Sequence, residues 1–146
     1  IGDVNGRAML AHAATAQGMR AVNHICGKKD AIRMEIMPAA VFTNPEVAGV
    51  GLTSDQCDSM GIEYNTHKGF YRSNGKALAM DESEGMVKLI TDKDNKIIGC
   101  HAYGAHAADL IQEATAIMNF NGTTENLVDI IHTHPTLEEI LHDAAL

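Results

Sequence analysis

The chain has 146 residues, a mass of 15.6 kDa and a formal net charge of −8, from 19 acidic and 11 basic side chains. This length suits one domain or slightly more and allows a hydrophobic core. The acidic balance argues against a nucleic-acid-binding domain, which needs a basic face, and against binding to anionic membrane surfaces. No apolar run reaches the roughly 18 residues that a bilayer crossing needs, so we expect no membrane-spanning segment.

The three cysteines, Cys26, Cys57 and Cys100, lie far apart and form no short metal or redox spacing. We expect each to be a small buried hydrophobic residue in a reducing compartment, not part of a disulfide framework. No signal peptide is visible, so a cytoplasmic location is the default expectation, although a mature organellar protein would look the same. The sequence opens on Ile1 without a methionine, and we expect a fragment of a longer protein.

Apolar residues recur near the helical period between Ala8 and Cys26. This spacing predicts a helix, which Gly27 would end as a C-terminal cap. The polar segment that follows, 28–34, is predicted to be a loop. We therefore divide the chain into residues 1–30, the end of one domain, and residues 31–146, a second domain.

The second domain begins with strand patterns and ends with helical ones. Thr53 and Gln56 have the spacing of a capping box, which predicts the start of a short helix. Because most strands precede the helices instead of alternating with them, the order predicts an α+β fold with helices packed on a mostly antiparallel sheet. The predicted elements are two short strands within 39–52 separated by a turn at Asn44-Pro45, a helix over 54–60, strands over 62–71, 86–91 and 96–103, and helices over 107–120, 124–132 and 137–145.

The segment 132–139 carries the strongest signal for chemistry. Imidazole titrates near neutrality and suits proton transfer, and such a base usually needs a carboxylate to fix its tautomer. Glu139 follows His134 by about one helical turn. We predict His134 as a general acid–base and Glu139 as its orienting partner.

Glu139 also has a structural interpretation. Thr136-x-x-Glu139 is itself a capping-box pattern, and an acidic side chain suits the positive end of a helix. The two roles are compatible, because one carboxylate can accept hydrogen bonds from both an amide and an imidazole.

Two other kinds of site have weaker support. The histidines at 101, 106, 132 and 134 allow a zinc or nickel site, but no cysteine pair or HExxH helix accompanies them. Our expectation is therefore that the chain has no metal site. There is also no GxGxxG or Walker pattern, so the chain lacks its own pyrophosphate-binding loop.

Three ordered motifs resemble the pyridine-nucleotide disulfide oxidoreductases, most closely their branch of NAD-dependent dihydrolipoamide dehydrogenases. The resemblance runs along the whole chain. The motifs are Gly2-Asp3-Val4 followed by Met9-Leu10-Ala11-His12, the stretch Phe42-Thr43-Asn44-Pro45-Glu46-Val47-Ala48-x-Val50-Gly51, and His134-Pro135-Thr136-Leu137-x-Glu139.

The resemblance implies roles for the matching positions. Residues 1–30 would end an FAD-binding domain, and residues 31–146 would be an interface (dimerisation) domain. Asp3 would accept a hydrogen bond from the ribityl chain of FAD, and the turn Met9-Leu10-Ala11 would present backbone N–H groups to the flavin. His134, before a cis Pro135, would be the acid–base acting on the partner subunit's redox disulfide, with Glu139 orienting it.

The resemblance also implies a function for the full-length protein, which would reoxidise dihydrolipoamide by thiol–disulfide exchange with FAD and NAD. Its partners would be a second copy of itself and dihydrolipoamide carried on a 2-oxo-acid dehydrogenase complex or the glycine cleavage system, with no nucleic acid and no membrane. The fragment alone would bind neither FAD nor NAD tightly and would be inactive. The alternatives are another disulfide reductase of this family, acting on glutathione or a similar thiol, a free-standing dimerisation module, and a histidine-based metal binder.

Overall fold

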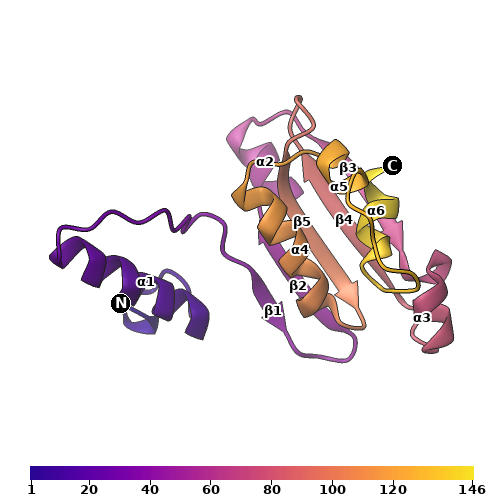
Figure 1. Cartoon of the computed structure of the whole chain (residues 1–146), viewed down its shortest axis with the longest axis horizontal. Helices are drawn as coiled ribbons and strands as arrows, with labels where there is room; N and C mark the ends of the chain where they lie inside the picture. The colour runs from indigo at the N-terminus through magenta and orange to yellow at the C-terminus, as the bar shows by residue number, and fades with distance from the viewer. The chain divides into compact units, whose positions relative to one another are not determined.

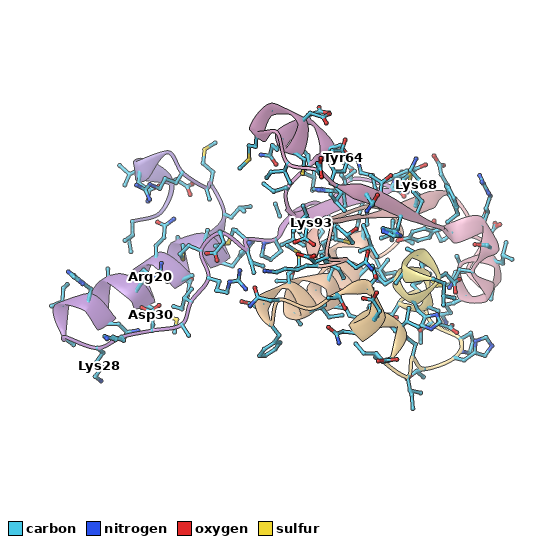
Figure 2. All side chains as sticks on the ribbon, turned by 90° about the horizontal axis from the view of Figure 1, so that it is seen from above. Arg20, Lys28, Asp30, Tyr64, Lys68 and Lys93 are labelled. Carbon is cyan, nitrogen blue, oxygen red and sulfur yellow. The ribbon has the colours of Figure 1, made fainter.

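The computed structural model describes all residues from 1 to 146 and divides the chain into two compact units, Ile1–Met37 and Pro38–Leu146. The boundary predicted after residue 30 lies inside the first unit, because the segment after the first helix folds back on it. Figure 2 shows Arg20 of that helix beside Asp30, to which its Nη2 donates a hydrogen bond of 3.1 Å. The same guanidinium donates to the carbonyl of Ile32.

The first unit contains a 3-10 helix, η1 (Asp3–Asn5), and the helix α1 (Ala11–Ile25). The side-chain oxygen of Gln17 accepts hydrogen bonds from the backbone N–H of Gly2 (2.8 Å) and from Asn5 Nδ2 (2.7 Å), which ties η1 to α1. The helix ends close to the predicted position, but Cys26 and not Gly27 is its C-cap residue. Gly27 follows in the left-handed region with a φ of 67°, and the N–H of Lys28 returns to the Asn23 carbonyl at 2.8 Å.

The second unit is a five-stranded sheet in the order β1-β2-β5-β4-β3, and every neighbouring pair of strands is antiparallel. The predicted α+β fold is therefore confirmed. The strands are β1 (Ala39–Val41), β2 (Glu46–Gly51), β3 (Asn65–Phe70), β4 (Gly85–Thr91) and β5 (Ile97–Gly104). The helices are α2 (Ser54–Met60), η2 (Tyr71–Ser73), α3 (Gly75–Ala79), α4 (Ala107–Asn119), α5 (Thr124–Val128) and α6 (Glu139–Ala145).

Helices α4 and α6 cover one face of this sheet, as Figure 1 shows. The helix α4 packs on β2 and β5, and α6 packs on β3 and β4. Their apolar faces bury Leu110, Ile111, Ile140 and Leu141 completely or almost completely. Because β3 is an edge strand, this packing places α6, and the loop before it, at the β3 edge of the sheet.

Two predicted helices are shorter in the structure. The helix predicted over 124–132 ends at Val128, and the one predicted over 137–145 begins at Glu139. Ile130 and Ile131 suggested a continuing apolar helix face, but they are 41% and 98% exposed and lie in a loop. The elements η1, η2 and α3 were not predicted. None of the helices combines the length and apolarity needed to cross a membrane.

Candidate acid–base site

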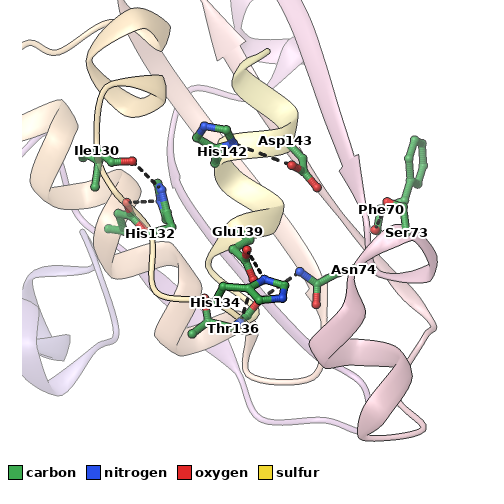
Figure 3. A network of polar contacts seen from close by, with 11 residues as sticks. Phe70, Ser73, Asn74, Ile130, His132, His134, Thr136, Glu139, His142 and Asp143 are labelled. Carbon is green, nitrogen blue, oxygen red and sulfur yellow. Dashed lines mark hydrogen bonds and ion pairs between the residues drawn. The ribbon is translucent and has the colours of Figure 1, made fainter.

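The loop between α5 and α6, residues 129–138, carries the predicted site. The helix α5 starts at a capping box formed by Thr123 and Asn126 and ends at Val128, with Asp129 as its C-cap residue. Beyond that point the chain runs without regular structure until α6, and Figure 3 shows the polar contacts that hold it. The peptide bond between His134 and Pro135 is cis, as the family resemblance implied.

His134 and Glu139 are brought together as predicted. Nδ1 of His134 lies 2.9 Å from Oε1 of Glu139, while the His134 side chain remains 77% exposed. A neutral imidazole that donates from Nδ1 to a carboxylate leaves Nε2 as its basic nitrogen. The pair can therefore take a proton from a group outside this chain.

Glu139 makes both of the contacts foreseen for it. Its second oxygen, Oε2, accepts the backbone N–H of Thr136 at 2.8 Å. This backbone hydrogen bond first, and the contact with His134 second, hold the pKa of the Glu139 carboxyl below its ordinary value. The carboxylate is thus charged at neutral pH and fixes the tautomer of His134.

The capping box predicted for Thr136 and Glu139 is only half formed. The Thr136 hydroxyl donates to the carbonyl of Thr133 at 2.7 Å and accepts no backbone N–H of α6, because the helix begins at Glu139 with Glu138 as its N-cap residue. Sequence spacing could not reveal this, because it does not show at which residue α6 begins.

Asn74 supports the loop and was not predicted as a site residue from the sequence. Its Nδ2 donates to the Thr136 carbonyl at 3.0 Å, and its Oδ1 accepts the N–H of Ala77 at 2.9 Å as the cap of α3. The signal was an asparagine directly before the helix-forming run 75–79. The residue is only 3% exposed, so it links α3 rigidly to the site.

His132 is placed differently from His134. Its side chain is 7% exposed, with Nδ1 at 3.0 Å from the Ile130 carbonyl and Nε2 at 2.9 Å from Oε1 of Glu113. Both ring nitrogens are occupied, which leaves no lone pair for a metal ion. The chain contains no group of three or more side chains arranged to hold a metal.

The residues expected to contact FAD lie in the first unit. Asp3 is exposed in η1, and Met9 and Leu10 lead into α1. Leu10 is the N-cap residue and offers no side-chain hydrogen bond to the helix. An end without a side-chain cap suits a negatively charged ligand group, so the turn Met9-Leu10-Ala11 fits the implied flavin contact. The contact of Asp3 with the ribityl chain stays a prediction.

The cysteines cannot supply a redox pair. Cys57 and Cys100 are buried as predicted, and burial raises the pKa of Cys100 to about 12 and also raises that of Cys57. Cys26 is exposed, contrary to the prediction, because it is the C-cap of α1 at the surface of its unit. All three cysteines are free in this structure.

Residues 37–145 match the dimerisation domain of the pyridine nucleotide-disulphide oxidoreductases. This match spans most of the chain, and the chain belongs to that family. The sequence is 41% identical to dihydrolipoyl dehydrogenase of Synechocystis sp., over 99% of this chain and 31% of the relative. It is 40% identical to mitochondrial dihydrolipoyl dehydrogenase 2 of Arabidopsis thaliana, over 100% of this chain and 29% of the relative.

A solved structure is similar over nearly the whole chain. The crystal structure of LpdA from Mycobacterium tuberculosis has a TM-score of 0.91 at 28% identity, over 99% of this chain and 32% of that one. The flavoprotein disulfide reductase RclA of Escherichia coli shares the fold, with a TM-score of 0.88 at 22% identity over 99% of this chain and 34% of that one. The chain thus spans about a third of the length of the proteins that it matches.

Proposed function

We propose that this chain is the C-terminal part of an FAD-containing, NAD-dependent dihydrolipoamide dehydrogenase. The observation that carries the proposal is the His134–Glu139 pair, held at 2.9 Å on an exposed loop with Nε2 left as the base. The names of the relatives, dihydrolipoyl dehydrogenases at about 40% identity, support this branch of the family over a glutathione-type reductase.

His134 would control the proton in thiol–disulfide exchange. The attacking species is the thiolate, so Nε2 removes the proton from a dihydrolipoamide thiol. The thiolate then attacks one sulfur of a redox disulfide supplied from outside this chain, which forms a mixed disulfide and releases the other sulfur as a thiolate. The imidazolium, stabilised by Glu139, returns its proton to a leaving thiolate.

The N-terminal unit would contribute to the flavin site. Asp3 and the backbone of Met9, Leu10 and Ala11 are the residues we assign to FAD. When bound there, FAD would supply electron transfer between the redox disulfide and NAD. Neither cofactor is expected to bind this part of the protein tightly on its own.

We also propose the partners. The matched family is a dimerisation domain, which supports a homodimer. In that dimer, His134 of one subunit would serve the disulfide of the other. The substrate would be dihydrolipoamide on a 2-oxo-acid dehydrogenase complex or the glycine cleavage system. The free-standing module and the histidine-based metal binder have no comparable support, and both nitrogens of His132 are already occupied.

The proposal is tested on the full-length polypeptide that contains this chain. We expect a yellow protein much heavier than 15.6 kDa that oxidises dihydrolipoamide with NAD. His134→Gln should lower kcat by about 10²–10⁴-fold, the usual loss for a general base. Flavin content should not change. The matched control is His106→Gln, since His106 forms a similarly exposed pair with Asp109 at 3.1 Å outside the loop. A colourless protein, or normal turnover in His134→Gln, would contradict the proposal.

A further inference from the structure

Two residues before His134, the loop is attached to helix α4 by a second histidine. The imidazole of His132 bridges the Ile130 carbonyl at 3.0 Å and the Glu113 carboxylate at 2.9 Å. Figure 3 shows this ring turned away from the exposed ring of His134. The His132 side chain is 7% exposed and that of Glu113 is 21% exposed, so the contact is largely shielded from solvent.

Both partners of His132 can only accept hydrogen bonds. A carbonyl and a carboxylate have no proton to give, and a neutral imidazole carries a single N–H. The two contacts form together only when both ring nitrogens are protonated. When it is protonated on both nitrogens, the imidazole donates to both acceptors, and the Glu113 carboxylate balances its charge.

The other charged and titratable groups around His132 do not compete for its nitrogens. His142 of α6 meets the ring edge-on, at 5.4 Å between ring centres, and its own Nδ1 lies 3.8 Å from Asp143. Asp129 of the loop and Glu139 of α6 line the same surface hollow. Glu139 is engaged by His134 and Thr136 instead.

These contacts fix the loop on both sides of His134. The His132–Glu113 ion pair holds it from α4, and Asn74 holds it at the Thr136 carbonyl. Apart from Glu139, no side chain of this chain forms a hydrogen bond or ion pair with the His134 ring. The position of that ring relative to a group outside the chain therefore depends on the loop backbone.

We infer that Glu113 and His132 are positioning residues of the acid–base site, which act by fixing the loop that carries His134. This inference rests on the proposed function. A displacement of about 1 Å at a reacting group can reduce the rate by about 100-fold. We therefore expect Glu113→Ala to lower kcat for dihydrolipoamide oxidation in the full-length flavoprotein by about 10- to 100-fold. FAD content and KM for NAD should stay the same.

A double-mutant cycle separates positioning from a general loss of folding. If Glu113 acts through His134, then Glu113→Ala adds no further loss in a His134→Gln background. Gln112→Ala is the matched control, because Gln112 is the exposed neighbour of Glu113 on α4. We expect that variant to keep the wild-type kcat.

Glu113→Gln provides a second test that preserves side-chain shape. Its amide oxygen still accepts from Nε2, but the negative charge that stabilises the imidazolium is gone. Without that charge the ring that donates from both nitrogens is less stable, so the kcat of this variant should fall below that of wild type. This variant also serves in the cycle if Glu113→Ala does not fold.

The outcomes distinguish the two claims. Normal turnover in His134→Gln overturns the proposed function. A large loss in His134→Gln together with wild-type turnover in Glu113→Ala and Glu113→Gln overturns the positioning role alone. An equal loss from the Glu113 substitution in both backgrounds also overturns it, because such a loss does not pass through His134.

Discussion

Replacing Glu139 by glutamine is expected to reverse the tautomer of His134. In the structure both oxygens of Glu139 accept hydrogen bonds, Oε1 from the imidazole at 2.9 Å and Oε2 from the Thr136 N–H at 2.8 Å. A glutamine has only one acceptor oxygen. The backbone N–H of Thr136 can only donate, so it takes that oxygen and leaves the amide NH2 facing Nδ1 of His134.

The imidazole can adapt only by accepting at Nδ1. Its proton then moves to Nε2, the nitrogen that has to receive the substrate proton. In a serine protease the corresponding Asp→Asn change lowers kcat by about 10⁴ through the wrong tautomer. The His134 side chain is 77% exposed, so it can exchange tautomers through water, and we expect a smaller loss of about 10²-fold. The loss should also be smaller than that in His134→Gln.

The assay is dihydrolipoamide oxidation with NAD by the full-length flavoprotein. NADH oxidation by ferricyanide in the same preparation serves as the internal control, since it uses the flavin without a thiol proton transfer. We expect the first activity to fall and the second to stay constant. Wild-type dihydrolipoamide turnover in Glu139→Gln would refute the assignment of Glu139 as the residue that orients His134.

Three further predictions concern stability and cofactor binding. The pKa of Glu139 is lowered in the folded state, so its contribution to the free energy of unfolding is fully present above the ordinary pKa of 4.5 and is lost as the pH falls through the lower pKa of the folded protein. The thermal midpoints of wild type and Glu139→Gln should therefore converge in that acidic range. Gly104→Ala should destabilise the second unit by about 1–3 kcal/mol, since the added Cβ would lie 2.5 Å from Cζ of the buried Tyr71. Gly75→Ala should not destabilise it, because no atom lies within 4 Å of the added Cβ, and equal denaturant midpoints for the two variants would contradict this prediction. Asp3→Ala should weaken flavin retention in the full-length protein during dialysis, and an unchanged ratio of flavin to protein absorbance would contradict the assigned contact.

Local signals were sufficient for most of the elements. The strands predicted over 86–91 and 96–103 correspond to β4 and β5, which pair with each other, and Thr53 with Gln56 predicted the capping box that starts α2. The order of the strands in the sheet could not be predicted from the sequence, because β2 pairs with β5 across a long stretch of intervening chain. Apolar periodicity also failed at Ile130 and Ile131, which are exposed although their spacing is helical.

The site also contains some residues that the sequence could predict and others that it could not. His134 and Glu139 lie five residues apart, and this spacing together with the family resemblance allowed their pairing to be predicted. The supports come from elsewhere: Glu113 reaches His132 from α4, and Asn74 reaches the loop from the start of α3. Such contacts depend on how α3, α4 and α6 pack on or beside the sheet, and spacing along the chain carries no information about that packing.

The most direct test is the rate at which dihydrolipoamide reduces the flavin in a stopped-flow experiment. The full-length wild-type protein and its His134→Gln variant are mixed with dihydrolipoamide in the absence of NAD, and each is mixed with NADH as a control. The account predicts a reduction by dihydrolipoamide that is about 10²–10⁴-fold slower in the variant, with equal rates for NADH. Equal rates with dihydrolipoamide would contradict the role of His134, and no flavin signal at all would contradict the placement of this chain in a flavoenzyme.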